Sequence, residues 1–160
     1  MNKLRLSSFV ATLSFASSAI SAEIPPPQVA LVNSLYKAFA FEAVLDEPMG
    51  PYFIDQPKEV LLRYITPDLF ELIHRDRVCT STTHEICRLD FAPLWGNQDP
   101  AGTSVSFKTG LSGDTVVGHM RIGSQSTQLV YSLVQTRAGW RINDITYDNG
   151  WTLRKILGAQ

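Results

Sequence analysis

The sequence predicts an α+β fold in which N-terminal helices pack on a strongly curved four-stranded antiparallel sheet. Two observations predict the elements: apolar residues recur at helical spacing in the front half, and from Thr103 onward the period changes to two. A third predicts the curvature. In the last expected strand the apolar phase shifts by one residue, which indicates a β-bulge, and bulges bend sheets.

The first 22 residues are expected to form a cleavable secretory signal. A short basic start precedes an apolar stretch from about Leu6 to Ala16, and small residues follow as far as Ala22. The apolar stretch is shorter than the roughly 20 residues that a transmembrane helix needs. Cleavage after Ala22 would leave residues 23–160 as a single periplasmic domain, soluble and without a membrane anchor; cleavage after Ala19 is the alternative.

Three helices are expected before the sheet. Residues 28–44 place apolar side chains at helical spacing and predict one amphipathic helix. The proline- and glycine-rich residues 46–55 predict a loop, and a short helix is expected to start at Pro57. Thr66 is expected to cap a further helix, because Pro67 is suited to the first helical position.

The back half predicts a meander of four strands joined by three tight turns. The expected strands cover residues 103–111, 115–122, 127–136 and 140–147. In the fourth strand Trp140 and Ile142 are in one phase, whereas Ile145 and Tyr147 are in the other, so the bulge is expected near Asn143 and Asp144. A short terminal helix is expected over residues 151–157.

The two cysteines, Cys79 and Cys87, are expected to form a disulfide, because an isolated close pair in an exported domain favours one. Two alternatives use the same residues. Together with His84 they could supply three zinc ligands, although a fourth is missing, or one cysteine could pair with a histidine as a nucleophile.

The expected binding surface is the loop from Asp90 to Asp99, within a long connection from Cys79 to Gly102, since long loops are often functional. Trp95 in it could be an exposed interface anchor or a buried lid on the core. Asp90 and Asp99 could belong to a catalytic carboxylate set with Asp144 and Asp148, or could accept hydrogen bonds from turn amides. The expected binding residues are Asp90, Phe91, Trp95, Asn97, Gln98 and Asp99, with Asp144 at the bulge beneath them.

Two stretches resemble a family of exported bacterial domains of unknown function with a nuclear transport factor 2-like, cystatin-like cone fold. They are the segment from Leu89 to Asp99 and the end of the chain, residues 140–145 and 153–157. The usual form of the family has a second aspartate where this chain has Ala92. The resemblance implies helices that close over the concave side of a curved sheet, and it implies no known reaction.

Composition and motifs exclude several function classes. Of 14 lysines and arginines, two lie in the expected signal, which leaves twelve against 15 acidic residues; this argues against nucleic acid as a partner. Neither a hydrolase elbow, nor a zinc helix motif, nor a nucleotide-binding loop is present. We therefore expect no cofactor, no metal and no enzyme activity.

The expected function is a periplasmic protein-binding module, most concretely an immunity protein that neutralises a toxin acting on the cell envelope or wall. Its partner would be another envelope protein. The first alternative is an envelope protein that binds a small ligand in the mouth of the cone. The second is a hydrolase that uses the carboxylates.

Overall fold

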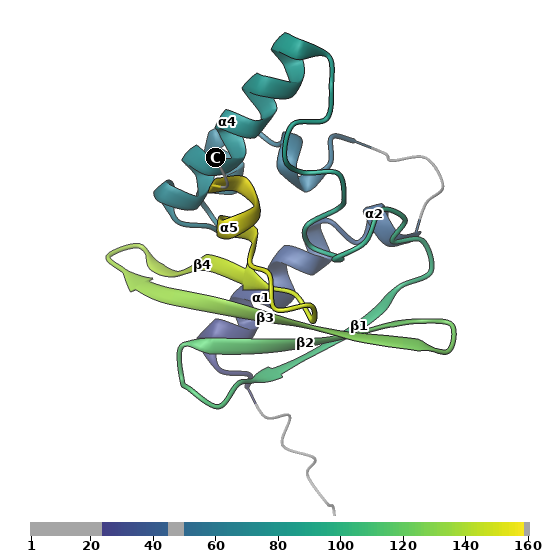
Figure 1. The fold of residues 1–160 in the computed structure, drawn as a ribbon. Coiled ribbons are helices and arrows are strands. Elements are labelled where there is room, and N and C mark those ends of the chain that lie inside the picture. The colour runs from purple at the N-terminus through teal and green to yellow at the C-terminus, as the bar shows by residue number, and fades with distance from the viewer. Residues whose placement is uncertain (1–23, 45–49, 159–160) are drawn as a thin grey trace, which may run out of the picture.

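The computed structural model describes residues 24–44 and 50–158 (Figure 1). The expected signal, residues 1–22, lies outside the described residues, as does part of the expected loop, residues 45–49. In the described part a helical front is followed by a sheet of consecutive strands, as the change of period predicts. The α+β class is therefore confirmed.

The first expected helix is divided in two. α1 (Pro27–Ala38) ends at Phe39, whose N–H still donates to the carbonyl of Leu35 at 3.1 Å, and α2 (Phe41–Val44) follows after a turn. The prediction of one continuous helix over residues 28–44 was wrong. The turn redirects the chain, so that the side chains of Glu42 and Ala43 on α2 are buried.

The next helices begin close to where the sequence predicts. A short 3₁₀ helix, η1 (Phe53–Asp55), precedes α3 (Lys58–Leu61) and α4 (Pro67–Thr83). Thr66 caps α4 by accepting a hydrogen bond from the N–H of Leu69 at 3.3 Å. α4 continues well past its apolar residues into the segment expected to be a loop, and it ends at His84, which has a φ of 58°.

The sheet is the expected antiparallel meander, in the order β1-β2-β3-β4. Its strands are β1 (Ser104–Thr109), β2 (Thr115–Ile122), β3 (Gln125–Thr136) and β4 (Gly139–Thr146), and the terminal helix is α5 (Leu153–Gly158). The Gly123 turn joins β2 to β3, and its φ of 57° explains why a glycine stands there.

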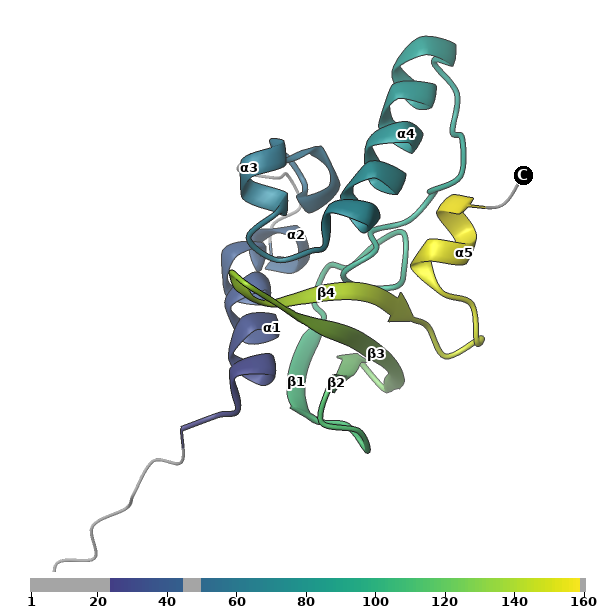
Figure 2. The same ribbon diagram turned by 90° about the vertical axis from the view of Figure 1, so that its left-hand side faces the viewer.

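The bulge in β4 is confirmed. Leu133 of β3 pairs with Ile142, but the preceding residue Ser132 pairs with Asp144, so Asn143 is the extra residue. The strong curvature expected from it is wrong, because the strands twist without curling the sheet strongly (Figures 1 and 2). The bulge is confined to one strand pair, whereas β1, β2 and β3 pair in unbroken register; strongly curved sheets need bends repeated across strands.

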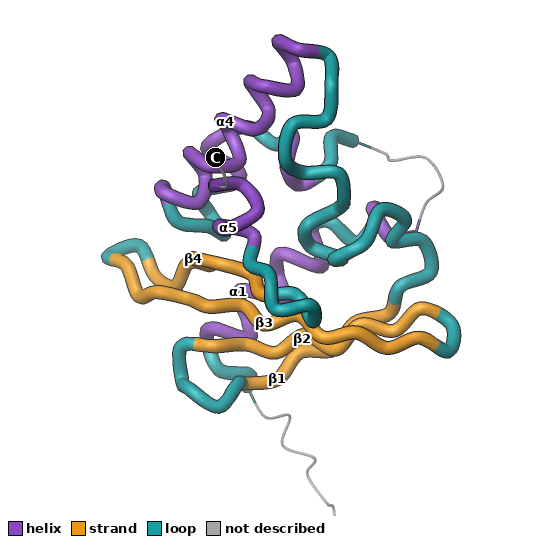
Figure 3. The backbone as a smooth tube through the Cα atoms, in the orientation of Figure 1, coloured by secondary structure: helices purple, strands orange, loops and turns teal. Residues whose placement is uncertain are grey.

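The helices divide between one face of the sheet and its β4 edge. α1 packs on the inner face, and α4 and α5 lie beyond β4 (Figures 2 and 3). Tyr64, Ile65 and Thr66 line the outer edge of β4, where the N–H of Ile142 donates to the carbonyl of Tyr64 at 2.8 Å. No helix in the described ranges is long and apolar enough to cross a membrane.

The expected disulfide is present. Cys79 near the end of α4 is joined to Cys87, which ties the returning chain to the part of α4 that projects farthest from the sheet (Figure 1). Because both sulfur atoms are used, the alternative zinc and nucleophile sites are not formed. Disulfides persist mainly in oxidising compartments, in agreement with an extracytoplasmic location.

The double variant Cys79→Ser/Cys87→Ser is expected to lower the free energy of unfolding by about 2.5 kcal/mol, because it releases the loop constraint in the unfolded chain. Urea unfolding measures this loss. Wild type treated with a reductant is the control and should match the variant. Two free thiols in denatured, unreduced wild type would contradict the disulfide itself.

Candidate functional site

The segment from His84 to Thr103, here called the α4–β1 loop, contains six of the seven expected binding residues. Its backbone closes a small turn: the N–H of Ala92 donates to the carbonyl of Asn97 at 2.8 Å, and the N–H of Gly96 donates to the carbonyl of Ala92 at 2.9 Å. Gly96 has a φ of 69°. A Cβ there would meet the side chain of Leu129 at 3.2 Å, so another residue would strain the backbone and crowd Leu129.

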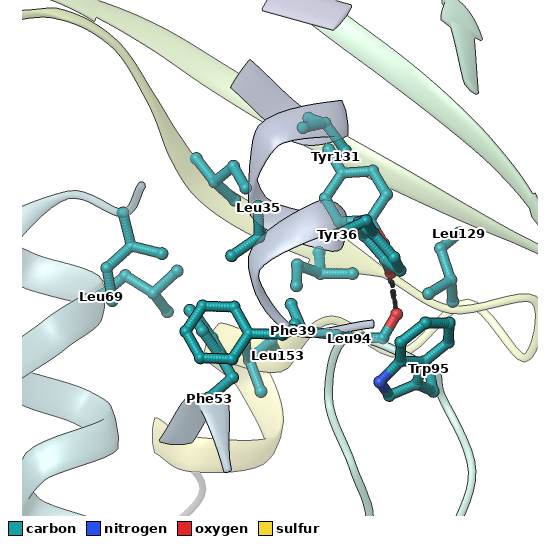
Figure 4. Close-up of a cluster of buried hydrophobic side chains, with 14 of the residues drawn as sticks. Leu35, Tyr36, Phe39, Phe53, Leu69, Leu94, Trp95, Leu129, Tyr131 and Leu153 are labelled. Atoms are coloured by element: carbon teal, nitrogen blue, oxygen red, sulfur yellow. Dashed lines mark hydrogen bonds between the residues drawn. The ribbon is translucent and has the colours of Figure 1, made fainter. Parts of the chain in front are cut away.

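Trp95 points into the core and is only 2% exposed (Figure 4). Its ring meets the edge of the Tyr36 ring at a centroid distance of 5.0 Å. Its indole N–H donates to Oε2 of Glu42 at 2.8 Å. Of the two alternatives for Trp95, the buried lid is therefore correct and the exposed interface anchor is wrong.

The space between α1 and the sheet is filled by side chains rather than left open. The Tyr36 hydroxyl donates to the carbonyl of Leu94 and lies against the hydroxyl of Tyr131 (Figure 4). Burial raises the pKa of both tyrosines, so both stay neutral. These side chains leave no room for a ligand deep between α1 and the sheet at this point.

Glu42 on α2 is a buried carboxyl group that the sequence analysis missed. Its Oε1 accepts from the N–H of Phe53 at 2.5 Å, and its Oε2 accepts from Trp95. Burial raises the pKa of Glu42 above its usual range, and the two hydrogen bonds oppose that shift only in part. The available signal was its place three residues after Phe39, which puts it in the apolar stripe of the expected helix.

Glu42 lines a small hollow of about 270 Å³ between α2, η1 and the α4–β1 loop, here called the Glu42 pocket. Most of its other walls are apolar. Its lining residues are Glu42, Tyr52, Phe53, Ile54, Phe91, Ala92, Pro93, Gln98 and Pro100. A largely apolar hollow with a buried carboxyl group in its wall suits a ligand that carries both an apolar part and a hydrogen-bond donor.

A second hollow of about 530 Å³, here called the Asn97 pocket, lies between the same loop and the turn that follows β4. Its lining residues are Phe91, Gly96, Asn97, Gln98, Tyr147, Asp148, Asn149 and Ile156. Phe91 and Gln98 line both pockets, so the two hollows adjoin. The Phe91 ring packs edge-on against Tyr147 at 5.1 Å between centroids.

The expected aspartates have structural partners. Asp99 accepts from the N–H of Ala101 at 3.2 Å, as turn aspartates do, and Asp90 accepts from the side chain of Gln98 at 3.5 Å. Asp144 accepts from the N–H of Arg154 at 3.0 Å, which ties the bulge to α5. None of these three lines either pocket. The structure thus brings Phe91, Asn97 and Gln98 to the pockets and leaves the aspartates and Trp95 outside them.

No group of three metal-binding side chains that could hold an ion occurs within residues 24–44 and 50–158. Asp148, the fourth aspartate of the carboxylate hypothesis, accepts from the hydroxyl of Thr127. Each of the four carboxylates thus accepts a hydrogen bond from a different protein group.

Comparison with known proteins assigns no family to the chain. No protein family matches it, and no curated protein matches it. The resemblance to exported nuclear transport factor 2-like domains is therefore supported only as far as the α+β architecture. One solved structure, a phospholipid-binding protein from Ralstonia solanacearum in complex with a phospholipid, aligns with 81% of this chain and 68% of its own, at 15% identity and a TM-score of 0.38. A likeness at this level says nothing about what this chain binds, and its function has to be argued from its own residues.

Proposed function

We propose that the protein is a non-catalytic small-ligand-binding protein of the cell envelope that holds the apolar part of its ligand in the Glu42 pocket. The observation that carries this proposal is the buried carboxyl group in the wall of a mostly apolar hollow. Each carboxyl oxygen accepts one protein N–H and retains a further lone pair. A hydroxyl or amino group at the end of an apolar ligand could donate to it.

The chemistry of the Glu42 pocket also selects against anions. Among the residues that the structure describes, no lysine, arginine or histidine lines it, and Glu42 is its carboxyl group. A carboxylate or phosphate placed there would lose its hydration without gaining a cationic partner, which is costly. We therefore expect alcohols and amines with an alkyl chain to bind, and fatty acids to bind far more weakly.

The variant Ala92→Phe tests this site, because Ala92 lines the Glu42 pocket and a phenyl ring there would occupy it. By calorimetry, wild type should bind 1-octanol, and Ala92→Phe should bind it at least tenfold more weakly. Octanoate should give little heat with either protein.

The matched control is Ala101→Phe, which adds the same ring at an exposed position of the same loop and should bind like wild type. Circular dichroism checks that each variant folds. Equal affinity of folded Ala92→Phe and wild type for 1-octanol would refute the proposed site. A wild type that binds no alkyl alcohol would refute the proposed function.

An immunity role is a second candidate, and one observation favours it. Val78 on the projecting part of α4 is 48% exposed, and Ile86 beside the disulfide is 71% exposed. Large apolar side chains that are exposed near the end of α4, where the disulfide fixes the chain, suit a protein interface. The supporting result would be an envelope enzyme that is inhibited by wild type and not by Val78→Asp/Ile86→Asp.

A further inference from the structure

We infer that the Asn97 pocket holds the head group of the same ligand, and that this head group is neutral and rich in hydroxyls, as in a sugar. The inference rests on the proposed function, since the apolar part would occupy the adjoining Glu42 pocket. Phe91 and Gln98 line both hollows, so a ligand that passes between them would fill both. The full ligand would then be an amphiphile of the alkyl glycoside type.

The polar groups of the Asn97 pocket match hydroxyls better than ions. Three neutral amides line it, those of Asn97, Gln98 and Asn149, together with the carboxylate of Asp148. An amide offers a donor and an acceptor, and a hydroxyl needs both. No lysine, arginine or histidine of the described part of the chain lines the pocket, and Asp148 would repel a phosphate. Two aromatic side chains, those of Phe91 and Tyr147, line the same pocket, and aromatic rings suit the carbon side of a sugar ring.

The side chain of Asn97 makes no hydrogen bond within the described part of the protein that would explain why an asparagine stands there. Its Oδ1 is shut off from solvent and has no hydrogen-bond partner among the residues that the structure describes. A buried polar group without a partner destabilises a fold. The preceding residue, Gly96, has a φ of 69°, which a residue with a side chain would adopt only with strain. The amide nitrogen of the Asn97 side chain is not shut off in the way that Oδ1 is, and it can donate to a hydroxyl in the pocket.

Calorimetry with octyl β-D-glucoside below its micelle concentration tests the inference, with 1-octanol and methyl β-D-glucoside as the two halves. Wild type should bind octyl glucoside at least tenfold more tightly than 1-octanol, and methyl glucoside least tightly. Asn97→Leu should reduce the affinity for octyl glucoside to about that for 1-octanol. Because this change removes an unpartnered polar group, it should not lower the melting temperature.

Gln128→Leu is the matched control, because it makes the same kind of change on an exposed residue of β3 that lines neither pocket. It should keep the wild-type preference for octyl glucoside. If wild type binds 1-octanol and octyl glucoside equally, or if Asn97→Leu keeps the preference, the head-group assignment fails and the proposed function stands. If wild type binds neither compound, the proposed function itself fails. If methyl glucoside binds as tightly as octyl glucoside, the alkyl chain contributes nothing to the affinity. The ligand would then be a sugar and not an amphiphile.

Discussion

Trp95→Ala is expected to lower the free energy of unfolding by about 3–5 kcal/mol, the range for removing a large aromatic side chain from a core. The side chain is 2% exposed, and the space it would leave adjoins the Tyr36 ring. The change also removes the donor to Oε2 of Glu42. For a domain of this size the melting temperature should fall by about 10–20 °C, which thermal unfolding followed by circular dichroism measures.

Trp151→Ala is the control for this prediction. Trp151 is 55% exposed, so the same change there should alter stability by only about 0.5 kcal/mol. An equally small loss at both tryptophans would show that Trp95 is not the buried lid described above. A large loss at Trp95 alone would agree with its burial.

Glu42→Leu is expected to lower the free energy of unfolding by about 3 kcal/mol. It leaves two buried donors, the N–H of Phe53 and the indole N–H of Trp95, without their acceptors. Each buried donor left unpaired costs about 1–3 kcal/mol. Urea unfolding measures the loss, and Glu59→Leu, at an exposed glutamate of α3, should cost far less.

The loss from Glu42→Leu should be larger near pH 4 than near pH 8. Burial raises the pKa of Glu42 in the folded protein. Its contribution to stability is therefore fully present below the ordinary glutamate pKa of about 4.3 and is lost as the pH rises through the raised pKa. A loss that grew with pH would mean that the hydrogen bonds from Phe53 and Trp95 outweigh the effect of burial.

Most elements of the fold could be predicted from local patterns, because strand alternation and helix capping depend on neighbouring residues. The break between α1 and α2 could not, since the apolar stripe runs on from Phe39 to Ala43 across the turn. The outer part of α4 could not either, because it projects into solvent and has no apolar face to place inward. The curvature of the whole sheet cannot be deduced from one phase shift in one strand.

The site could be predicted in part. The length and composition of the α4–β1 loop predicted Phe91, Asn97 and Gln98 as binding residues, and these three line the pockets. Glu42 was missed because a glutamate on an amphipathic helix usually faces solvent. Its two donors come from residues 11 and 53 positions farther along the chain, and only the folded arrangement brings them together.

The bulge in β4 sets unequal limits on how this chain can change in length during evolution. Asn143, its extra residue, accepts from Arg154 of α5 at 3.2 Å and from the Thr66 hydroxyl at 3.4 Å. Deleting one residue there would turn Ile145 and Tyr147 from the core to the opposite face. Insertions in the β3–β4 turn would not disturb that alternation. Lineages of this protein should therefore vary freely in hairpin length while keeping two residues between Ile142 and Ile145.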